Sequence, residues 1–164
     1  MSRVRSILCL ALLNAVVLPL SGAETSNLIR YVSVRSVPET SFKRISEYFD
    51  QQENLGGNII LRSQPNHRAG YYFILSLAKS AADVLANGMI ELHYFREGEN
   101  LHILETFELP SPIPDSKEIW LGLTGSSDIG PNASILAWKI VTRNANGAIL
   151  GSKKSFLWEL PPEN

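Results

Sequence analysis

Residues 134–158 read S-I-L-A-W-K-I-V-T-R-N-A-N-G-A-I-L-G-S-K-K-S-F-L-W. Apolar side chains recur at every second position on both sides of Asn146-Gly147, as in β-strands, whose side chains point alternately to opposite faces. Asn-Gly is also the dipeptide that most readily adopts the φ > 0 conformation of a two-residue hairpin turn. The stretch therefore predicts a β-hairpin with strands at residues 134–143 and 148–158.

The positions of Lys139 and Lys154 help to predict the register of this hairpin. A regular two-residue turn would place Lys139 opposite Lys154, where like charges repel. One extra residue in the second strand is a β-bulge, and Gly151 is its natural position. The bulge would place Lys139 across from Ser155 instead, and a longer, looser turn would give the same register far from the turn. We favour the bulge.

The bulged register also pairs the large side chains of the two strands. It sets Trp138 across from Phe156 and Leu136 across from Trp158. Cross-strand aromatic pairs of this kind stabilise sheets. We therefore expect Trp138 to be buried, paired with Phe156 and central to the core.

The start of the chain has the three parts of a secretory signal peptide. Arg3 and Arg5 are basic, residues 7–20 are an apolar run of 14 residues, and the small residues Ser21-Gly22-Ala23 follow. The run is short for a membrane-spanning helix, which needs about 20 apolar residues. We expect residues 1–23 to be a signal peptide cut after Ala23, and the alternative is an uncleaved anchor. Cleavage leaves 141 residues of the 164, enough for one domain with a core.

Composition narrows the classes of function. The single cysteine, Cys9, lies in the predicted signal, so the mature chain has no thiol for a disulfide, a metal site or a nucleophile. Of 15 Lys and Arg, two leave with the signal, and the remaining 13 face 16 Asp and Glu. Without a basic run, nucleic acid is not expected as a partner. No cofactor is expected either.

The segment at residues 24–57 predicts an N-terminal arm and one short amphipathic helix. Residues 28–37 predict a short strand or an extended arm, which Pro38 ends. Large apolar residues then recur at helical spacing: Phe42, Ile45, Tyr48 and Phe49. Such a helix normally packs on its own domain, and the alternative is that it binds a partner.

Residues 58–160 are dominated by strand patterns, and residues 161–164 are assigned to a C-terminal tail. Seven strands are expected, at residues 59–62, 70–78, 89–95, 101–109, 118–123, 134–143 and 148–158. The second of these strands is apolar on both faces at residues 71–75, as in a central strand. The fold class is therefore mainly β, a two-layer antiparallel sandwich that resembles immunoglobulin and fibronectin type III domains in architecture. The resemblance concerns architecture and implies no activity.

Two aromatic residues suggest a ligand-binding surface. Trp120 lies on the strand face opposite Ile119 and Leu121, and Tyr72 shares a face with Ile74. If exposed, both rings could stack on a sugar or anchor a protein partner. The alternative, which we favour, is that both faces of the strand are buried or that the helix from Phe42 covers this patch.

Histidines suggest a metal site. A hairpin turning at Glu97-Gly98 places His93 directly opposite His102, with Glu91 next along the same face. A shift by one residue would move the two histidines to opposite faces. Two imidazoles and a carboxylate could hold zinc, with water in the fourth position. The alternative, which we favour, is a solvated pair of side chains without metal.

These patterns together predict an exported, non-catalytic β-sandwich protein that acts by binding or assembly, in the periplasm or outside the cell. Its partner would be a protein or a carbohydrate, and no membrane span is expected after signal cleavage. The alternatives are a carbohydrate-binding module and a metal-dependent hydrolase using His67, His93 or His102 with loop carboxylates. The faint serine motif at Gly125-Ser126-Ser127-Asp128 lacks the G-x-S-x-G frame and predicts a turn. No catalytic residue is expected. A long unpaired edge strand would favour assembly by strand addition.

Overall fold

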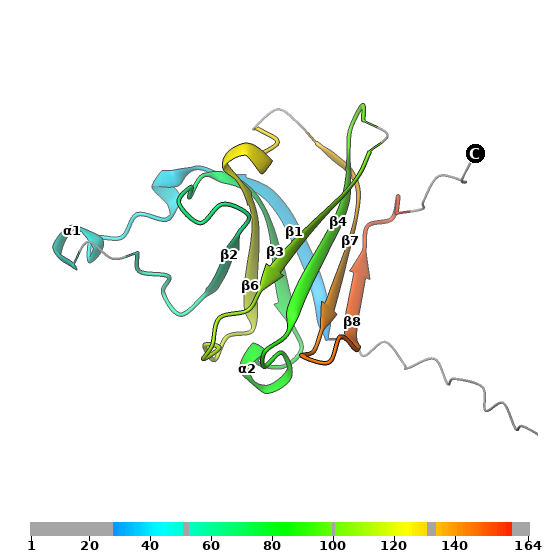
Figure 1. The fold of residues 1–164 in the computed structure, drawn as a ribbon. Helices are drawn as coiled ribbons and strands as arrows, with labels where there is room; N and C mark the ends of the chain where they lie inside the picture. Colours follow the sequence, from blue (N-terminus) through cyan, green and yellow to red (C-terminus); the bar gives the residue numbers. More distant parts are fainter. Residues whose placement is uncertain (1–27, 51–52, 100, 131–133, 159–164) are drawn as a thin grey trace, which may run out of the picture.

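Two four-stranded sheets face each other and form a β-sandwich in the computed structural model, which describes residues 28–50, 53–99, 101–130 and 134–158 (Figure 1). The first sheet has the strand order β1 (Ile29–Val37), β3 (Gly70–Leu77), β6 (Glu118–Thr124) and β2 (Ile59–Arg62). The second has the order β5 (His102–Glu108), β4 (Met89–Arg96), β7 (Ile135–Arg143) and β8 (Ile149–Lys154). Neighbouring strands are antiparallel, except that β2 runs parallel to β6. The predicted signal peptide and C-terminal tail lie outside the described residues.

The strand pattern of the sequence is largely confirmed. All seven expected strands are present, and their bounds differ from the expected ones by one residue or less except in β8, which ends at Lys154 rather than at residue 158. Residues 29–37 form an additional strand, β1, which pairs with β3 along its length. The sandwich therefore includes part of the segment that the sequence analysis assigned to an arm, and it begins before residue 58.

The main core lies between the sheets and explains the alternation of the strands. Phe73, Leu75 and Leu121 of the first sheet and Leu92 and Ile140 of the second are all 0% exposed. Burying each such side chain contributes about 1.5–3 kcal/mol. The expectation that β3 is buried on both faces is confirmed, because it lies between β1 and β6 and has a second apolar layer on its outer side.

The predicted amphipathic helix is wrong apart from its first apolar residue. The chain forms a 3-10 turn, η1 (Glu39–Ser41), and a single helical turn, α1 (Glu47–Asp50), which stands off from both sheets (Figure 1). Phe42 is buried against the outer face of the first sheet. Ile45, Tyr48 and Phe49 are 85%, 87% and 80% exposed. One helical turn is too short to direct residues 42 and 49 toward the same surface.

The end of the long hairpin differs from the expected two-residue turn. Asn144 N–H donates to the Ala148 carbonyl over 3.0 Å, and the Asn144 Oδ1 atom accepts from two backbone N–H groups within the turn. Gly147 has a φ of 79°, and Asn146 is not among the described non-glycine residues with positive φ. The turn therefore spans three residues, with only its glycine in the left-handed region.

The register of this hairpin is that of a regular two-residue turn, and the bulged register predicted from the sequence is wrong. Lys139 pairs with Lys154, because the three-residue turn and an extra residue at Leu150 shift the pairing in opposite directions. The bulge is thus real but lies next to Gly151. Phe156 is 99% exposed, so its predicted pairing with Trp138 is wrong. Trp138 instead pairs through its backbone with Ser155.

Trp138 is nevertheless on the core side of its sheet. Its ring is partly buried and contacts Phe73 of the facing sheet edge to face, with ring centroids 5.9 Å apart. Trp158 lies on the other side of the sheet, where it is 9% exposed and packs with Phe95 and Ala137.

Within the described residues, no helix is both long and apolar enough to cross a membrane.

Candidate functional site

His93 and His102 are brought together, although not in the predicted register. His93 pairs with Leu104 and His102 with Phe95, so the ladder between β4 and β5 is shifted by two residues from the expected one. A shift by two leaves both side chains on the outer face, because side chains alternate with a period of two. The two histidines are diagonal neighbours, and the distance between His93 Nδ1 and His102 Nε2 is 3.1 Å.

The two imidazole rings lie edge to edge in nearly one plane. The angle between the ring planes is 6°. Each nitrogen lies in its own ring plane, so the two nearly parallel planes are at most 3.1 Å apart. Rings that overlap face to face need about 3.5 Å between their planes, so these rings do not overlap. The ring centroids are 5.2 Å apart, about the nitrogen separation plus the two ring radii. The nitrogens therefore face each other in a hydrogen bond, in which one ring donates and the other accepts.

Glu91 fixes which nitrogen of His93 carries the proton. Glu91 Oε2 lies 3.5 Å from His93 Nε2, and Glu91 Oε1 accepts from Arg143 Nε over 2.7 Å. The Arg143 guanidinium, more than His93, holds the pKa of the Glu91 carboxyl below its ordinary value, so the group is an anion. His93 therefore carries its proton on Nε2, and its Nδ1 lone pair accepts from His102.

Burial favours the neutral form of His93. The pKa of His93 is lowered mainly by desolvation and further by His102 and Lys139, while Glu91 acts in the opposite direction. Trp158 covers the pair edge-on, with its ring centroid 6.2 Å from that of His93 and 5.9 Å from that of His102. Phe95 contacts both His102 and Trp158.

Glu91, His93 and His102 do not converge on one point. Glu91 contacts the ring nitrogen of His93 that faces away from His102, so the three-ligand zinc site considered from the sequence is not formed. Among the described residues, no group of three or more His, Cys, Asp or Glu side chains could hold a metal ion. His67, the third histidine, lies in the turn before β3 and lines a different cavity of about 280 Å³ with Asp128 and Arg68.

The two aromatic residues with a proposed ligand role are covered. Tyr72 is 0% exposed, and Trp120 is partly buried. Phe42 lies over both rings, with centroids 5.1 Å from Tyr72 and 5.9 Å from Trp120. Arg35 stacks on Trp120 with its guanidinium carbon 5.4 Å from the ring centroid. The patch is covered, as in the favoured alternative, but by the single side chain of Phe42, which follows a 3-10 turn and lies in no helix.

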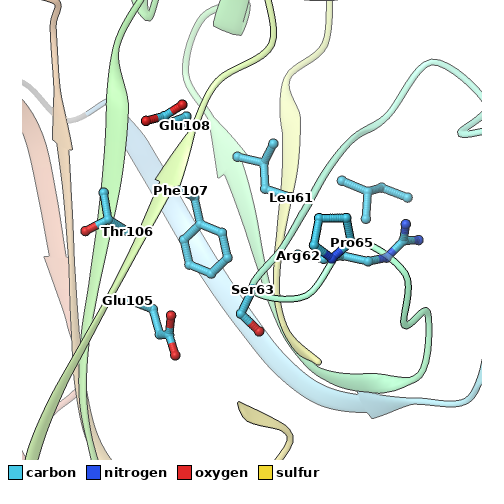
Figure 2. Close-up of a pocket in the computed structure, with 9 residues that line it drawn as sticks. Leu61, Arg62, Ser63, Pro65, Glu105, Thr106, Phe107 and Glu108 are labelled. Carbon is cyan, nitrogen blue, oxygen red and sulfur yellow. The ribbon is translucent and has the colours of Figure 1, made fainter. Parts of the chain in front are cut away.

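An open seam between the sheets forms the second candidate site. β2 and β5 are the terminal strands of their sheets and lie on the same side of the sandwich. A cavity of about 300 Å³ lies between them, lined by residues 60–63, Pro65 and residues 105–108. Figure 2 shows the Phe107 ring reaching from β5 into this space and Leu61 on the β2 side. The opposite seam is bridged, because Lys153 Nζ of β8 donates to the Arg30 carbonyl of β1 over 3.2 Å.

Glu105 is the residue of this seam that sequence reasoning missed. It has the same strand parity as Ile103 and Phe107, which pack into the core. Its carboxylate accepts a hydrogen bond from Ser127 Oγ over 3.0 Å. Glu108 is exposed at the end of β5. The signal was available in the sequence, since an acidic residue at an inward position of a strand indicates an edge or a cavity.

Arg62, the cation of the seam, is already paired. Two of its N–H groups donate to the two carboxylate oxygens of Glu53 over 2.7 and 2.6 Å. Glu105 and Glu108 therefore set the charge of the cavity. The site combines apolar side chains such as Phe107, the carboxylates of Glu105 and Glu108, and two strand edges.

The chain matches no protein-family model, no curated protein and no solved structure.

Proposed function

We propose that the protein is an exported, non-catalytic sandwich of immunoglobulin-like architecture that binds an extended segment of another protein at the seam between β2 and β5. The observation that carries the proposal is the cavity of about 300 Å³ between two terminal strands. A terminal strand has backbone N–H and C=O groups on its outer side that can pair with an added strand. The seam therefore offers both backbone hydrogen bonds and a pocket for a side chain.

The size of the cavity supports a peptide over a small molecule. Small-molecule sites usually have volumes of about 300–1,000 Å³ and enclose most of their ligand. The seam is at the low end of this range, and its lining residues come from two neighbouring strand edges. It fits one large side chain of a strand that runs along the edge of β2 or β5. Carbohydrate binding through Tyr72 has less support, because that ring is fully buried.

The charge of the cavity defines the partner further. Arg62 is neutralised by Glu53, whereas Glu105 and Glu108 line the β5 side. An inward-directed carboxylate discourages pairing with a purely apolar strand. The segment that fits is therefore extended, with an apolar residue for the pocket and a Lys or Arg next to it.

Peptide selection against the purified chain tests this function. A displayed library of short linear peptides should yield binders in which apolar and basic residues alternate. Glu108→Lys should abolish their binding, and Asp83→Lys, the same charge change at an exposed position in α2, should leave it intact. Bound peptide should slow amide hydrogen exchange at residues 105–108. Binders that ignore Glu108→Lys, or that protect β1 and β8 instead, would contradict the proposal.

Export is the other part of the proposal, and it is supported by the basic start, the apolar run and the small residues before Glu24. Sequencing of material secreted from an expressing cell should begin at Glu24 or within a residue or two. Protein that stays in the cytosol with Met1 intact would contradict export without affecting the binding experiment.

A further inference from the structure

We propose that His93 and His102 form a binding site for a divalent late transition metal, with Cu²⁺ bound more tightly than Zn²⁺. The site lies on the outer face of the second sheet and is independent of the seam. It has two ligands from the protein and leaves the remaining positions to water.

The separation of the two ring nitrogens suits such an ion. Zinc binds imidazole nitrogen at 2.0–2.1 Å, so two nitrogens around a tetrahedral ion are about 3.3 Å apart. His93 Nδ1 and His102 Nε2 are 3.1 Å apart before any ion is bound. The ion takes the place of the bridging proton, and the rings tilt so that both lone pairs point at it.

The protons balance without a change of charge on the rings. His93 already presents the lone pair of Nδ1, because its proton is on Nε2 beside Glu91. His102 must change tautomer: Nε2 gives up its proton, and Nδ1 of this exposed ring takes one from water. Both rings stay neutral, which is the form of imidazole that binds metals.

Glu91 is placed to hold the proton of His93 on Nε2, the nitrogen that does not bind the ion. Histidines that bind metals commonly give their other N–H to a carboxylate, which fixes the tautomer and raises the basicity of the ligating nitrogen. Glu91 is 3.5 Å from that N–H of His93 and is itself held by Arg143. Neutral imidazoles without thiolates select among Zn²⁺, Ni²⁺ and Cu²⁺, and the general affinity order puts Cu²⁺ first.

Calorimetric titration of the purified chain with Cu²⁺, and separately with Zn²⁺, tests the site. One ion per chain should bind, and His93→Ala and His102→Ala should each abolish this event. His67→Ala is the matched control and should leave it unchanged, because His67 lies in another cavity. His102 is exposed, so its variant should keep the fold, which circular dichroism verifies. Absence of a saturable event, or an event that survives both substitutions, would overturn the proposal.

Two further variants separate a positioning role of Glu91 from a merely structural one. Glu91→Gln and Arg143→Gln both break the same ion pair. Only Glu91→Gln removes the carboxylate from His93, and it should weaken Cu²⁺ binding by about 10- to 100-fold. Arg143→Gln should bind at least as tightly as wild type. Equal losses in the two variants would overturn the role of Glu91.

Trp158 provides an optical readout of the same site. Its ring is 5.9 Å from His102, close enough for bound Cu²⁺ to quench its fluorescence. Quenching should saturate at one ion per chain and should shrink in Trp158→Phe, which keeps an aromatic ring over the pair. Quenching that is unchanged in Trp158→Phe would place the ion elsewhere and overturn the assignment.

Discussion

Arg62 and Glu53 form a bidentate ion pair whose guanidinium side chain is only 6% exposed. The same guanidinium donates from Nε to Tyr72 Oη over 3.0 Å and lies 5.0 Å from the centre of the Phe42 ring. Tyr72 Oη in turn donates to the Arg68 carbonyl over 2.6 Å. The Arg62 guanidinium therefore links the segment between β1 and β2, which holds Glu53, to the outer face of the first sheet.

Removing this cation should be costly. Arg62→Met leaves the Glu53 carboxylate with only its longer contact to Arg68 Nε, at 3.7 Å, and breaking a buried ion pair costs about 3–5 kcal/mol. Glu53 is 21% exposed and can regain some water, so we expect a loss of about 3 kcal/mol in the free energy of unfolding. Arg62→Lys should recover little, because an ammonium group cannot form two parallel hydrogen bonds. Urea unfolding of Arg62→Met, of Arg62→Lys and of the double variant Arg62→Met/Glu53→Gln measures these changes in the free energy of unfolding. Full recovery in Arg62→Lys would contradict the bidentate role.

Glu47 should titrate below its ordinary pKa of 4.5. A hydrogen bond from Arg68 is the main cause, and burial acts in the opposite direction. Because the pKa is lower in the folded state, the contribution of Glu47 to stability is complete above pH 4.5 and is lost as pH falls through the folded-state pKa. Carbon-detected NMR titration should show the low midpoint, and Arg68→Gln should raise it. Lys43→Gln, which breaks the exposed ion pair with Glu39, should not change it.

Two phenylalanines give a matched test of the core. Phe73 is 0% exposed between the sheets, and Phe156 is 99% exposed after β8. Phe73→Ala should lower the free energy of unfolding by about 3–5 kcal/mol, the usual result of deleting a buried ring. Phe156→Ala should change it by less than about 0.5 kcal/mol. Equilibrium unfolding in denaturant compares them. Similar losses would mean that Phe156 is buried and that the pairing first predicted for it with Trp138 exists.

Strands could be predicted well from this sequence because burial on one or both sheet faces imposes a period of two on apolar residues. Relations between strands were harder. The hairpin at Gly98 and the hairpin at Gly147 both turn at the predicted glycine, yet both registers differ from prediction. A turn longer by one or two residues changes every pairing along the strands, and the alternation of side chains does not report turn length.

In the candidate sites, too, the face on which a side chain lies could be predicted, whereas the pairing between strands could not. Sequence parity placed His93 and His102 on one face correctly, and a register error of two residues changed their relation from opposite to diagonal. Glu105 at an inward position indicates that β5 lies at an edge or a cavity, but the partner strand of the seam could not be predicted, since it depends on which strands end their sheets. The exposure of Ile45 and its neighbours was missed because a periodic stripe indicates a helix without fixing how long the helix is.

Lys139 and Lys154 give the sharpest test of register. They are directly paired on the outer face of the second sheet, with like charges opposed. Lys154→Glu should convert this repulsion into attraction and stabilise the domain by about 0.2–1 kcal/mol, less at high salt. Lys153→Glu makes the same charge change on the other face and removes a hydrogen bond to Arg30, so it should not stabilise.

Ser155 distinguishes the two possible registers. In the bulged register predicted from sequence, Ser155 faces Lys139, and Ser155→Glu would be the stabilising change. In the structure the Ser155 hydroxyl accepts from the Trp138 N–H over 3.0 Å, so this substitution removes a hydrogen bond worth about 0.5–1.5 kcal/mol. Thermal unfolding of the variants decides between them: Lys154→Glu should melt above wild type and Ser155→Glu below it. The reverse order would show that β7 and β8 are paired one residue away from the register described above.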